Sequence, residues 1–136
     1  MIVNKLQKLK FDVILEPRIP HKLSFLKPDI VAIKDREVYV LDPSIVAASR
    51  DLNLAEEDKT RKYNNPSIAA WTKKKFGTVN THIAGVIMDW RGAWSPRSHH
   101  LLKEMGISDG LLDLMSFRVL KLNRWIYQCI CDRTDA

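Results

Sequence analysis

The stretch KPDIVAIKDREVYVLDPS, residues 27–44, constrains the fold more than any other, because apolar residues alternate through it in two runs. Such alternation predicts two neighbouring β-strands, and the charged segment 34–37 between them predicts a tight turn. Asp29 stands where the first run begins, and Asp42 stands where the second run ends. Each aspartate alone is explained as a strand end that bonds to local backbone. Together, at the ends of paired strands, the two carboxylates are expected to reach the same place.

The remaining segments predict a mixed α/β (α+β) fold in a single domain, residues 1–136. Further strands are expected in FDVILEPRIP (11–20), stopped by its prolines, and in THIAGVIMDWRGAW (81–94). Helices are expected in residues 1–10 and in four later segments. The second helix begins at a cap at Asn53, with Glu56 as its capping-box partner, and ends at Pro66, and the third runs from a cap at Ser67 to Phe76. The fourth runs from Ser95-Pro96 to before Gly106, and the fifth runs from Asp109 to about Asp132. This order of elements predicts a small mixed sheet flanked by helices.

Composition and charge limit the classes of function. The 136 residues are 46% hydrophobic, which is ordinary for a packed globular protein, and no apolar run approaches the length of a membrane span. The formal net charge of +6 favours a polyanionic partner, with nucleic acid first and a membrane surface second. Cys129 and Cys131 are spaced for neither a disulfide nor a metal site, so we interpret them as reduced thiols of an intracellular protein.

Asp29 and Asp42 are the candidate metal ligands. Two close carboxylates repel each other unless a cation lies between them, and hard cations such as Mg²⁺ take carboxylate oxygens together with water and substrate phosphate. A metal held in this way can activate a water and stabilise the leaving oxygen of a phosphodiester. Glu16 ends the preceding predicted strand in the same manner. It is either a third ligand or a solvated strand-end charge.

Lys59, Lys62 and Tyr63 follow at a spacing of i, i+3 and i+4, which places all three on one face of a predicted helix. Lysines on a helix are usually its solvated face, yet a lysine near an attacking water can orient it and stabilise the developing negative charge. The segment 59–75 contains six basic residues, no acidic residue and two aromatic rings, and its basic residues are Lys59, Arg61, Lys62, Lys73, Lys74 and Lys75. Such a mixture suits a phosphate backbone beside exposed bases.

These motifs together resemble the PD-(D/E)xK nuclease superfamily, and within it the restriction-like endonuclease domain of site-specific non-LTR (LINE-type) retrotransposons. In that family a Pro-Asp pair is followed by a second aspartate, and the catalytic lysine has moved onto the next helix in a K-x-x-K-Y pattern. Here Pro28-Asp29 is followed by Asp42 thirteen positions later and then by Lys59-Thr60-Arg61-Lys62-Tyr63. In the commoner superfamily pattern a lysine stands two positions after the second acid. This chain has Ser44 at that position, and the retrotransposon family also lacks the lysine there. EPRIP and RGAW extend the resemblance over most of the chain.

The resemblance implies a restriction-endonuclease-like core and a nuclear DNA endonuclease that depends on Mg²⁺ or Mn²⁺. In the family, the enzyme nicks double-stranded target DNA, and the 3′-hydroxyl of the nick primes reverse transcription and integration of the element. By this resemblance Asp29 and Asp42 ligate the metal with Glu16 as an outer ligand, Lys59 positions the attacking water, and Lys62 and Tyr63 support the scissile phosphate.

Family proteins carry a reverse transcriptase and a zinc-knuckle segment ahead of the nuclease. This chain is therefore expected to be a fragment of a longer polyprotein that includes those parts. The alternative is a non-catalytic nucleic-acid-binding module that keeps the same fold without hydrolysis.

A few other polar residues remain open to two interpretations. Arg91, between the tryptophans of WRGAW, either contacts DNA, like Arg61 and the lysines at 73–75, or lies beside the core. Asp89 is a candidate further acid near the sheet edge. His99 and His100 are adjacent, so on a helix they point about 100° apart and seldom chelate one ion. We interpret them as part of a helix surface near DNA.

Overall fold

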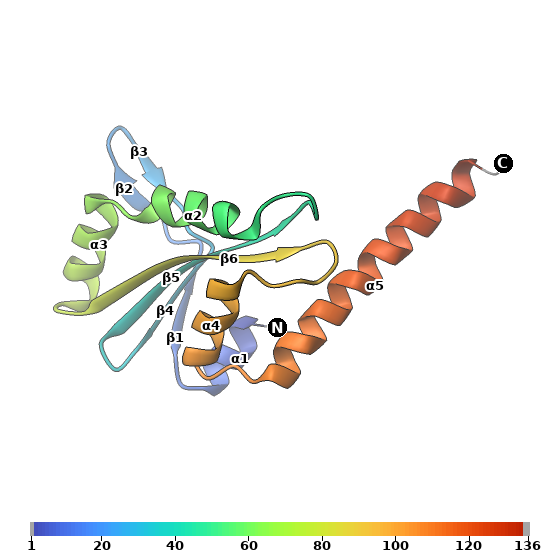
Figure 1. The fold of residues 1–136 in the computed structure, drawn as a ribbon. Coiled ribbons are helices and arrows are strands. Elements are labelled where there is room, and N and C mark those ends of the chain that lie inside the picture. Colours follow the sequence, from blue (N-terminus) through green and yellow to red (C-terminus); the bar gives the residue numbers. More distant parts are fainter. Residues whose placement is uncertain (1, 135–136) are drawn as a thin grey trace.

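The computed structural model describes the backbone of residues 2–134 and the side chains of residues 2–121. A four-stranded sheet in the order β1-β4-β5-β6 lies between two layers of helices, and a two-stranded sheet, β2-β3, projects beyond it (Figure 1). The elements are α1 (Ile2–Lys8), β1 (Asp12–Leu15), β2 (Ile19–His21), β3 (Ser24–Leu26), β4 (Ile30–Lys34), β5 (Glu37–Val46), α2 (Leu52–Tyr63), α3 (Pro66–Phe76), β6 (Asn80–Asp89), α4 (Pro96–Glu104) and α5 (Asp109–Thr134). The predicted mixed α/β fold, with a small mixed sheet flanked by helices, is confirmed.

The two central strands form the hairpin that the alternation predicts. β4 and β5 are antiparallel, and the turn between them is the pair Asp35-Arg36, whose φ angles of 51° and 66° suit a tight hairpin turn. β4 also pairs antiparallel with β1, whereas β6 runs parallel to β5. The α2 and α3 helices form the crossover between β5 and β6, as a parallel pair requires.

The prediction that the second strand ends at Asp42 was wrong. β5 continues through Pro43 to Val46, paired only with β6. Its other neighbour, β4, is paired with it only as far as Leu41. Beyond that point one edge of β5 has no strand beside it, so a proline without an N–H is tolerated there.

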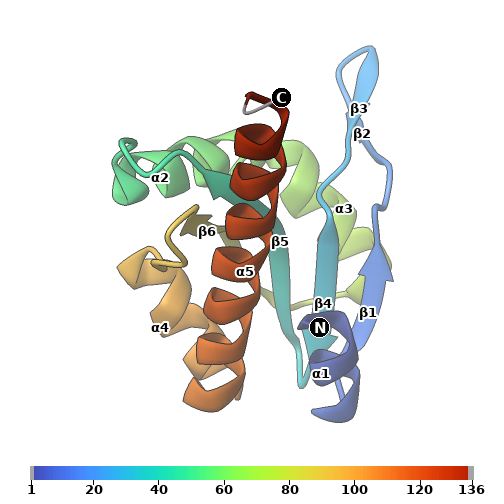
Figure 2. The same cartoon turned by 90° about the vertical axis from the view of Figure 1, so that its right-hand side faces the viewer.

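The sheet separates two apolar cores. Helices α1, α4 and α5 cover one face, and the packed core there contains Leu6, Ile30, Ala32, Leu41, Val86, Leu102 and Leu112. Helices α2 and α3 cover the other face over Val31, Val38, Val40, Tyr63 and Ile68. Figure 2 shows α5 running past the sheet on the side of α1 and α4. Within the residues described, no helix is both long and apolar enough to cross a membrane.

Two of the predicted helix starts are shifted. The α2 helix is capped by Asp51, whose carboxylate accepts hydrogen bonds from the amides of Asn53 and Leu54, and not by Asn53. Glu56 is consequently no capping-box partner. It is buried, and the Ser95 hydroxyl donates a hydrogen bond of 3.2 Å to its carboxylate.

The next helix, α3, is capped by Asn65 rather than Ser67, and Pro66 is its first residue rather than the end of α2. Ser95 caps α4 with Pro96 at the first position, as predicted. The α5 helix begins at Asp109, also as predicted, while the side chains of Cys129 and Cys131 lie outside the described residues.

Candidate active site

The three predicted acids lie in one row across the sheet. The ladder pairs Leu15 with Ile30 and Ile30 with Leu41, so one further step along the same registers sets Glu16, Asp29 and Asp42 side by side. The amide of Glu16 donates to the carbonyl of Asp29 at 2.9 Å, which continues the β1–β4 ladder by that step. The row therefore arises from strand register, with residues that are distant in sequence brought opposite one another.

Asp29 and Asp42 project from the same face of the sheet, the face covered by α2. Directly opposite side chains on antiparallel strands have Cβ atoms about 5 Å apart. The two carboxyl groups are near enough to hydrogen-bond when one is protonated. Partial burial, that hydrogen bond and the negative charges of Asp42 and Glu16 together raise the pKa of Asp29 above its usual 3.8. Deprotonation of Asp29 thus places its negative charge close to the charges of Asp42 and Glu16.

Lys59 supplies the positive charge of the site. Its Nζ lies 2.9 Å from Oδ2 of Asp42, whose side chain is only 7% exposed. The lysine comes from α2, and its stem crosses directly over Gly85 of β6, the residue paired with Asp42. A Cβ on Gly85 would lie 2.7 Å from the Cβ of Lys59, so any other residue would push this part of the helix away.

Tyr63 closes the inner side of the site. Its ring is 3% exposed, and its hydroxyl donates to the carbonyl of Lys27 at 3.3 Å. Burial, the charges of Asp42 and Asp29 and a hydrogen bond with Asp42 raise the pKa of Tyr63 to about 12. The phenol thus stays protonated and acts as a donor beside the two acids. This buried position suits a residue that holds the acids in place better than one that contacts the scissile phosphate.

Glu16 stands in the row, but its carboxylate is exposed and pairs with Lys27. Its φ of 48° is left-handed, its side chain is 61% exposed, and Oε1 lies 3.6 Å from Nζ of Lys27. Among the side chains that the structure describes, no three His, Cys, Asp or Glu groups are placed to hold a metal ion. The row therefore provides two close carboxylates, those of Asp29 and Asp42, with Glu16 nearby.

The predicted phosphate-binding residues surround this centre unequally. Lys62 is exposed, and its Nζ lies 5.1 Å from the centre of the Tyr63 ring. It lines, with Lys59, Ser44 and Arg50, a surface depression of about 230 Å³. Arg61 pairs at 3.5 Å with Asp58, which also lines this depression.

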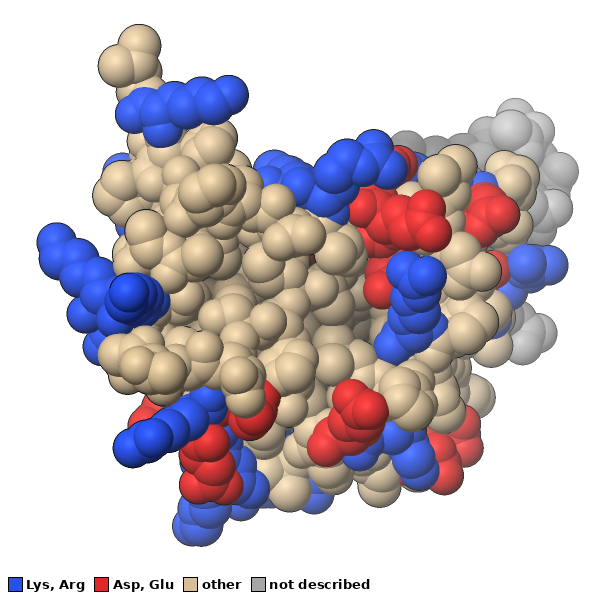
Figure 3. Space-filling view, turned by 60° about the vertical axis from the view of Figure 1, so that its left-hand side comes forward, with Lys and Arg blue, Asp and Glu red and all other residues tan. Residues whose placement is uncertain are grey.

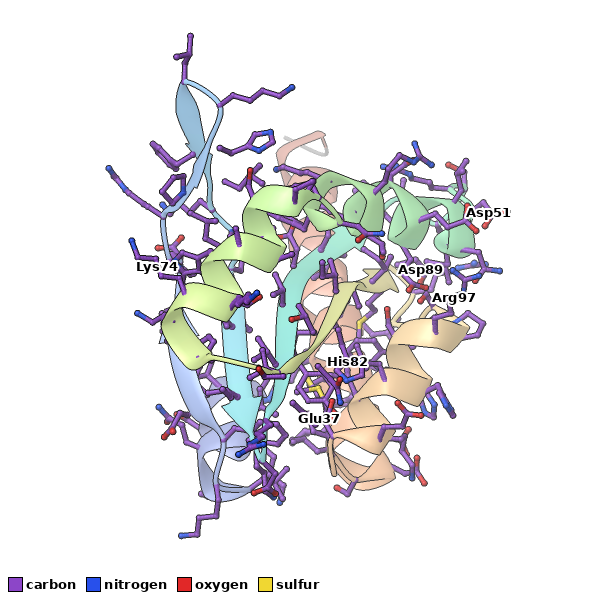
Figure 4. All side chains as sticks on the ribbon, turned by 90° about the vertical axis from the view of Figure 1, so that its left-hand side faces the viewer. Glu37, Asp51, Lys74, His82, Asp89 and Arg97 are labelled. Carbon is purple, nitrogen blue, oxygen red and sulfur yellow. The ribbon has the colours of Figure 1, made fainter. Side chains whose placement is uncertain are left out.

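The α3 lysines (Lys73, Lys74 and Lys75) occupy the exposed last turn of α3. Lys75 lies 5.6 Å from the centre of the Trp71 ring, and Lys74 points outward from the helix (Figure 4). They are separate from the acidic row and face solvent.

Arg91 and Asp89 form a structural unit at the end of β6, away from His82 at its start (Figure 4). Asp89 is 1% exposed, and its carboxylate accepts from the Arg91 guanidinium at 3.0 Å and from the amides of Arg91 and Ala93. Burial alone would raise the pKa of Asp89, but these donors outweigh it and lower the pKa. Asp89 is therefore explained without a part in the acidic row.

The two adjacent histidines, His99 and His100, contact different acidic residues. His100 pairs with Glu104 at 2.9 Å, one turn along α4, and His99 lies 3.8 Å from Asp109. They belong to the α4 surface, on the side of the sheet opposite to Asp29 and Asp42.

Sequence patterns did not predict a role for Gly85. A single glycine within an apolar strand indicates a close approach of another segment, and here that segment is α2 with Lys59. That signal was present in THIAGVIMDW, but nothing in the sequence told which segment would approach.

The raised pKa of Asp29 predicts a pH signature for stability without divalent cations. A carboxyl with a higher pKa in the folded chain contributes stability that is fully present below its usual pKa of 3.8 and is lost as pH rises through the raised value. Asp29→Asn cannot show this loss. We expect the melting temperature of Asp29→Asn, relative to the parent, to increase from about pH 4 to about pH 7. A difference that stays constant over this range would contradict the arrangement.

The chain is similar to segments of retrotransposon Pol polyproteins. It is 29% identical over 113 residues to the retrovirus-related Pol polyprotein from type-2 retrotransposable element R2DM of Drosophila melanogaster, a match covering 81% of this chain and 10% of that protein. It is 28% identical over 114 residues to the Pol polyprotein from type-1 retrotransposable element R2 of Nasonia vitripennis, covering 79% and 11%. A third relative is the R2 Pol polyprotein of Bradysia coprophila, 29% identical over 96 residues. No model of a known protein family matches the chain.

The chain thus spans about a tenth of the length of the curated relatives it matches. The expected relation to retrotransposon polyproteins is confirmed at this level.

Proposed function

We propose that this chain is a divalent-metal-dependent DNA endonuclease domain of the PD-(D/E)xK type. It nicks one strand of a target duplex, and the 3′-hydroxyl at the nick primes reverse transcription and integration of a non-LTR retrotransposon. The observation that carries the proposal is the meeting of Asp29, Asp42 and Lys59 at one point of the sheet, with Lys59 Nζ 2.9 Å from Asp42. The similarity to R2 Pol polyproteins supports the biological setting.

The donor chemistry of the acidic row fits Mg²⁺ or Mn²⁺. Both ions prefer oxygen ligands, and Mg²⁺ is commonly held by one or two carboxylates completed by water and substrate phosphate. Asp29 and Asp42 would be the ligands, with Glu16 able to join them by a change of its side-chain rotamer. When bound, the ion supplies Lewis-acid stabilisation of the phosphodiester's developing negative charge. No imidazole or thiolate lies in the row, so Zn²⁺ should serve poorly.

The chain's own groups have distinct parts in this chemistry. Lys59 carries a proton-bearing ammonium next to Asp42, where it can orient an attacking water and offset negative charge on the phosphate. Tyr63 acts as a positioning residue, because its buried phenol donates to the carbonyl of Lys27, two residues before Asp29, and lies beside Asp42. Lys62 and the depression that it lines would hold a neighbouring phosphate.

A plasmid assay tests the proposal directly. Purified protein should convert supercoiled plasmid to the nicked circle with Mn²⁺ or Mg²⁺, and it should not do so with excess chelator or with Zn²⁺ alone. Failure to nick any substrate with either ion, by protein that binds DNA, would favour the alternative, a non-catalytic binding module of the same fold.

In the proposed setting the domain works in the nucleus as part of a longer polyprotein. Its partners would be the double-stranded DNA target and the reverse transcriptase and zinc-knuckle segments of the same chain. The basic residues of this domain would then hold DNA close to the acids, and the other segments of the polyprotein would share in selecting the target sequence.

The α3 lysines should contribute affinity without sequence preference. Replacing all three with alanine should weaken binding to every duplex alike, and should lower the slope of log affinity against log salt by up to about 0.9 for each phosphate that is no longer neutralised. Fluorescence anisotropy over a salt series measures both. A control with the same change of charge replaces three lysines on the opposite face of the sheet, Lys5, Lys8 and Lys121. An equal weakening in this control, or a weakening for one sequence only, would contradict the assignment.

A further inference from the structure

The β2–β3 hairpin packs against α3 along β2, and its tip projects beyond the helices (Figure 4). Its strands pair Ile19 with Leu26 and His21 with Ser24, so Lys22 and Leu23 alone form the turn. Two contacts hold it, one at its base and one directly before its turn. Ile19 is fully buried in the core beneath α3, and a hydrogen bond of 2.8 Å joins His21 Nδ1 to the Ser67 hydroxyl at the start of α3. The hairpin is thus a firmly held projection.

The tip of this projection is apolar and its sides are basic. Leu23 is completely exposed, with a relative accessibility of 106%. Phe25 is 44% exposed, and the Arg18 guanidinium lies 4.8 Å from its ring centre. The segment 17–27 contains Arg18, Lys22 and Lys27 and no acidic residue. Blue side chains project from this part of the surface in Figure 3.

The hairpin is rooted in the candidate active site. The chain enters it directly after Glu16 and leaves it directly before Asp29, and the 2.9 Å bond from the Glu16 amide to the Asp29 carbonyl closes its base. Leu23 is six residues from Asp29, so at a rise of about 3.3 Å per residue it lies at most about 20 Å away. That reach equals about six base steps of 3.4 Å along a DNA strand.

We propose that the β2–β3 hairpin enters a groove of the bound duplex and that Leu23 inserts between stacked bases within about six steps of the scissile phosphate. The β-ribbons of DNA-binding proteins lie in the major or the minor groove, and apolar wedges of minor-groove binders partly unstack the base step that they enter. The basic residues favour DNA over an apolar protein partner, because Arg18 and Lys22 would face phosphates of the groove, while Lys27 pairs with Glu16 nearer the acids. The claim that Leu23 inserts near a scissile phosphate rests on the proposed nuclease function, but the insertion itself does not.

Unstacking can be measured without cleavage. The probe is a duplex with repeated thymine–adenine steps, which deform easily, with 2-aminopurine replacing successive adenines. In an Asp42→Asn background, binding should raise 2-aminopurine fluorescence, and adding Leu23→Ala should abolish that rise. The matched control is Leu114→Ala, which removes an exposed leucine from α5. Because Leu23 packs against nothing in the core, Leu23→Ala should melt at the parent temperature.

Nicking provides a second readout in the otherwise unmodified protein. Leu23→Ala should nick fully paired DNA at least about tenfold more slowly, the equivalent of a modest unstacking cost. It should nick a substrate with a mismatched bubble near the cleavage position within about twofold of the parent, because the bubble is already unstacked there.

The outcomes separate the two proposals. Equal fluorescence with Leu23 and with alanine overturns the insertion, whether or not the protein nicks. A weaker binding of Leu23→Ala to all DNA without any fluorescence difference also overturns it, since that describes surface contact alone. Binding to the rest of the polyprotein that depends on Leu23, again without a fluorescence change, would assign the hairpin to a protein partner instead. A Leu23-dependent fluorescence rise in a protein that nicks nothing would support the insertion while the nuclease proposal fails.

Discussion

Replacing Asp42 with asparagine should reduce Mn²⁺-dependent plasmid nicking by more than about 10³-fold, a reduction typical of groups that act as a unit in catalysis. Asparagine keeps the volume of this buried side chain but removes the charge that a cation requires. Affinity for DNA at a fixed salt concentration should stay equal or increase, because one negative charge facing the phosphates is gone. Rates of nicked-circle formation and anisotropy titrations measure the two effects.

The control for this variant is Asp35→Asn in the β4–β5 turn, which changes the net charge equally at an exposed position. It should nick like the parent. Asp29→Asn should match Asp42→Asn, and the double variant should be scarcely worse than either one, since each alone empties the same place. Nicking by Asp42→Asn within about twofold of the parent would mean that these acids do not hold the metal.

Lys59→Met should slow nicking by about 10² to 10⁴-fold, which is the usual size of an acid–base contribution. Methionine retains the apolar stem over Gly85 and removes only the ammonium that lies 2.9 Å from Asp42. Lys62→Met, one turn along α2, is the matched comparison and should be slowed less, because Lys62 is exposed and not paired with an acid of the row. Single-turnover nicking at saturating protein isolates the chemical step.

A thermal melt of Lys59→Met belongs with that measurement, since the variant leaves Asp42 without its cationic partner. If the melting temperature holds and nicking is unchanged, Lys59 has no part in the chemistry. If Lys62→Met is the slower of the two, the catalytic contact lies one turn nearer the C-terminus of α2.

Local patterns predicted most of the fold because they express local forces. Alternation defined β4 and most of β5, and Ser95-Pro96 fixed the start of α4 through a cap that the structure contains. The hairpin of β2 and β3 was missed, because its strands are three residues long, one contains Pro20, and its turn lacks glycine or asparagine. The extension of β5 was missed because a proline is allowed there only by the departure of β4, which is a tertiary fact.

The candidate site was likewise predicted in part from local patterns, while the rest depended on tertiary packing. That Asp29 and Asp42 would lie together followed from two paired strands, since a hairpin's register is set by its turn. The arrival of Lys59 above them depends on how α2 packs on β6, and helix spacing alone gave its face but not its neighbour. The burial of Tyr63 was likewise invisible, because an aromatic residue at i+4 from a lysine suits either a surface or a core.

Gly85 bears on how copies of such an element can be compared. A survey of related sequences by the acids and lysines alone would count as intact any copy that keeps them. Because a single added carbon at Gly85 would meet the Lys59 stem at 2.7 Å, a copy with alanine or valine there would keep every charged group and still have its helix displaced. Gly85 is thus a further marker, beside the residues that would do the chemistry, of a sequence that can form this site.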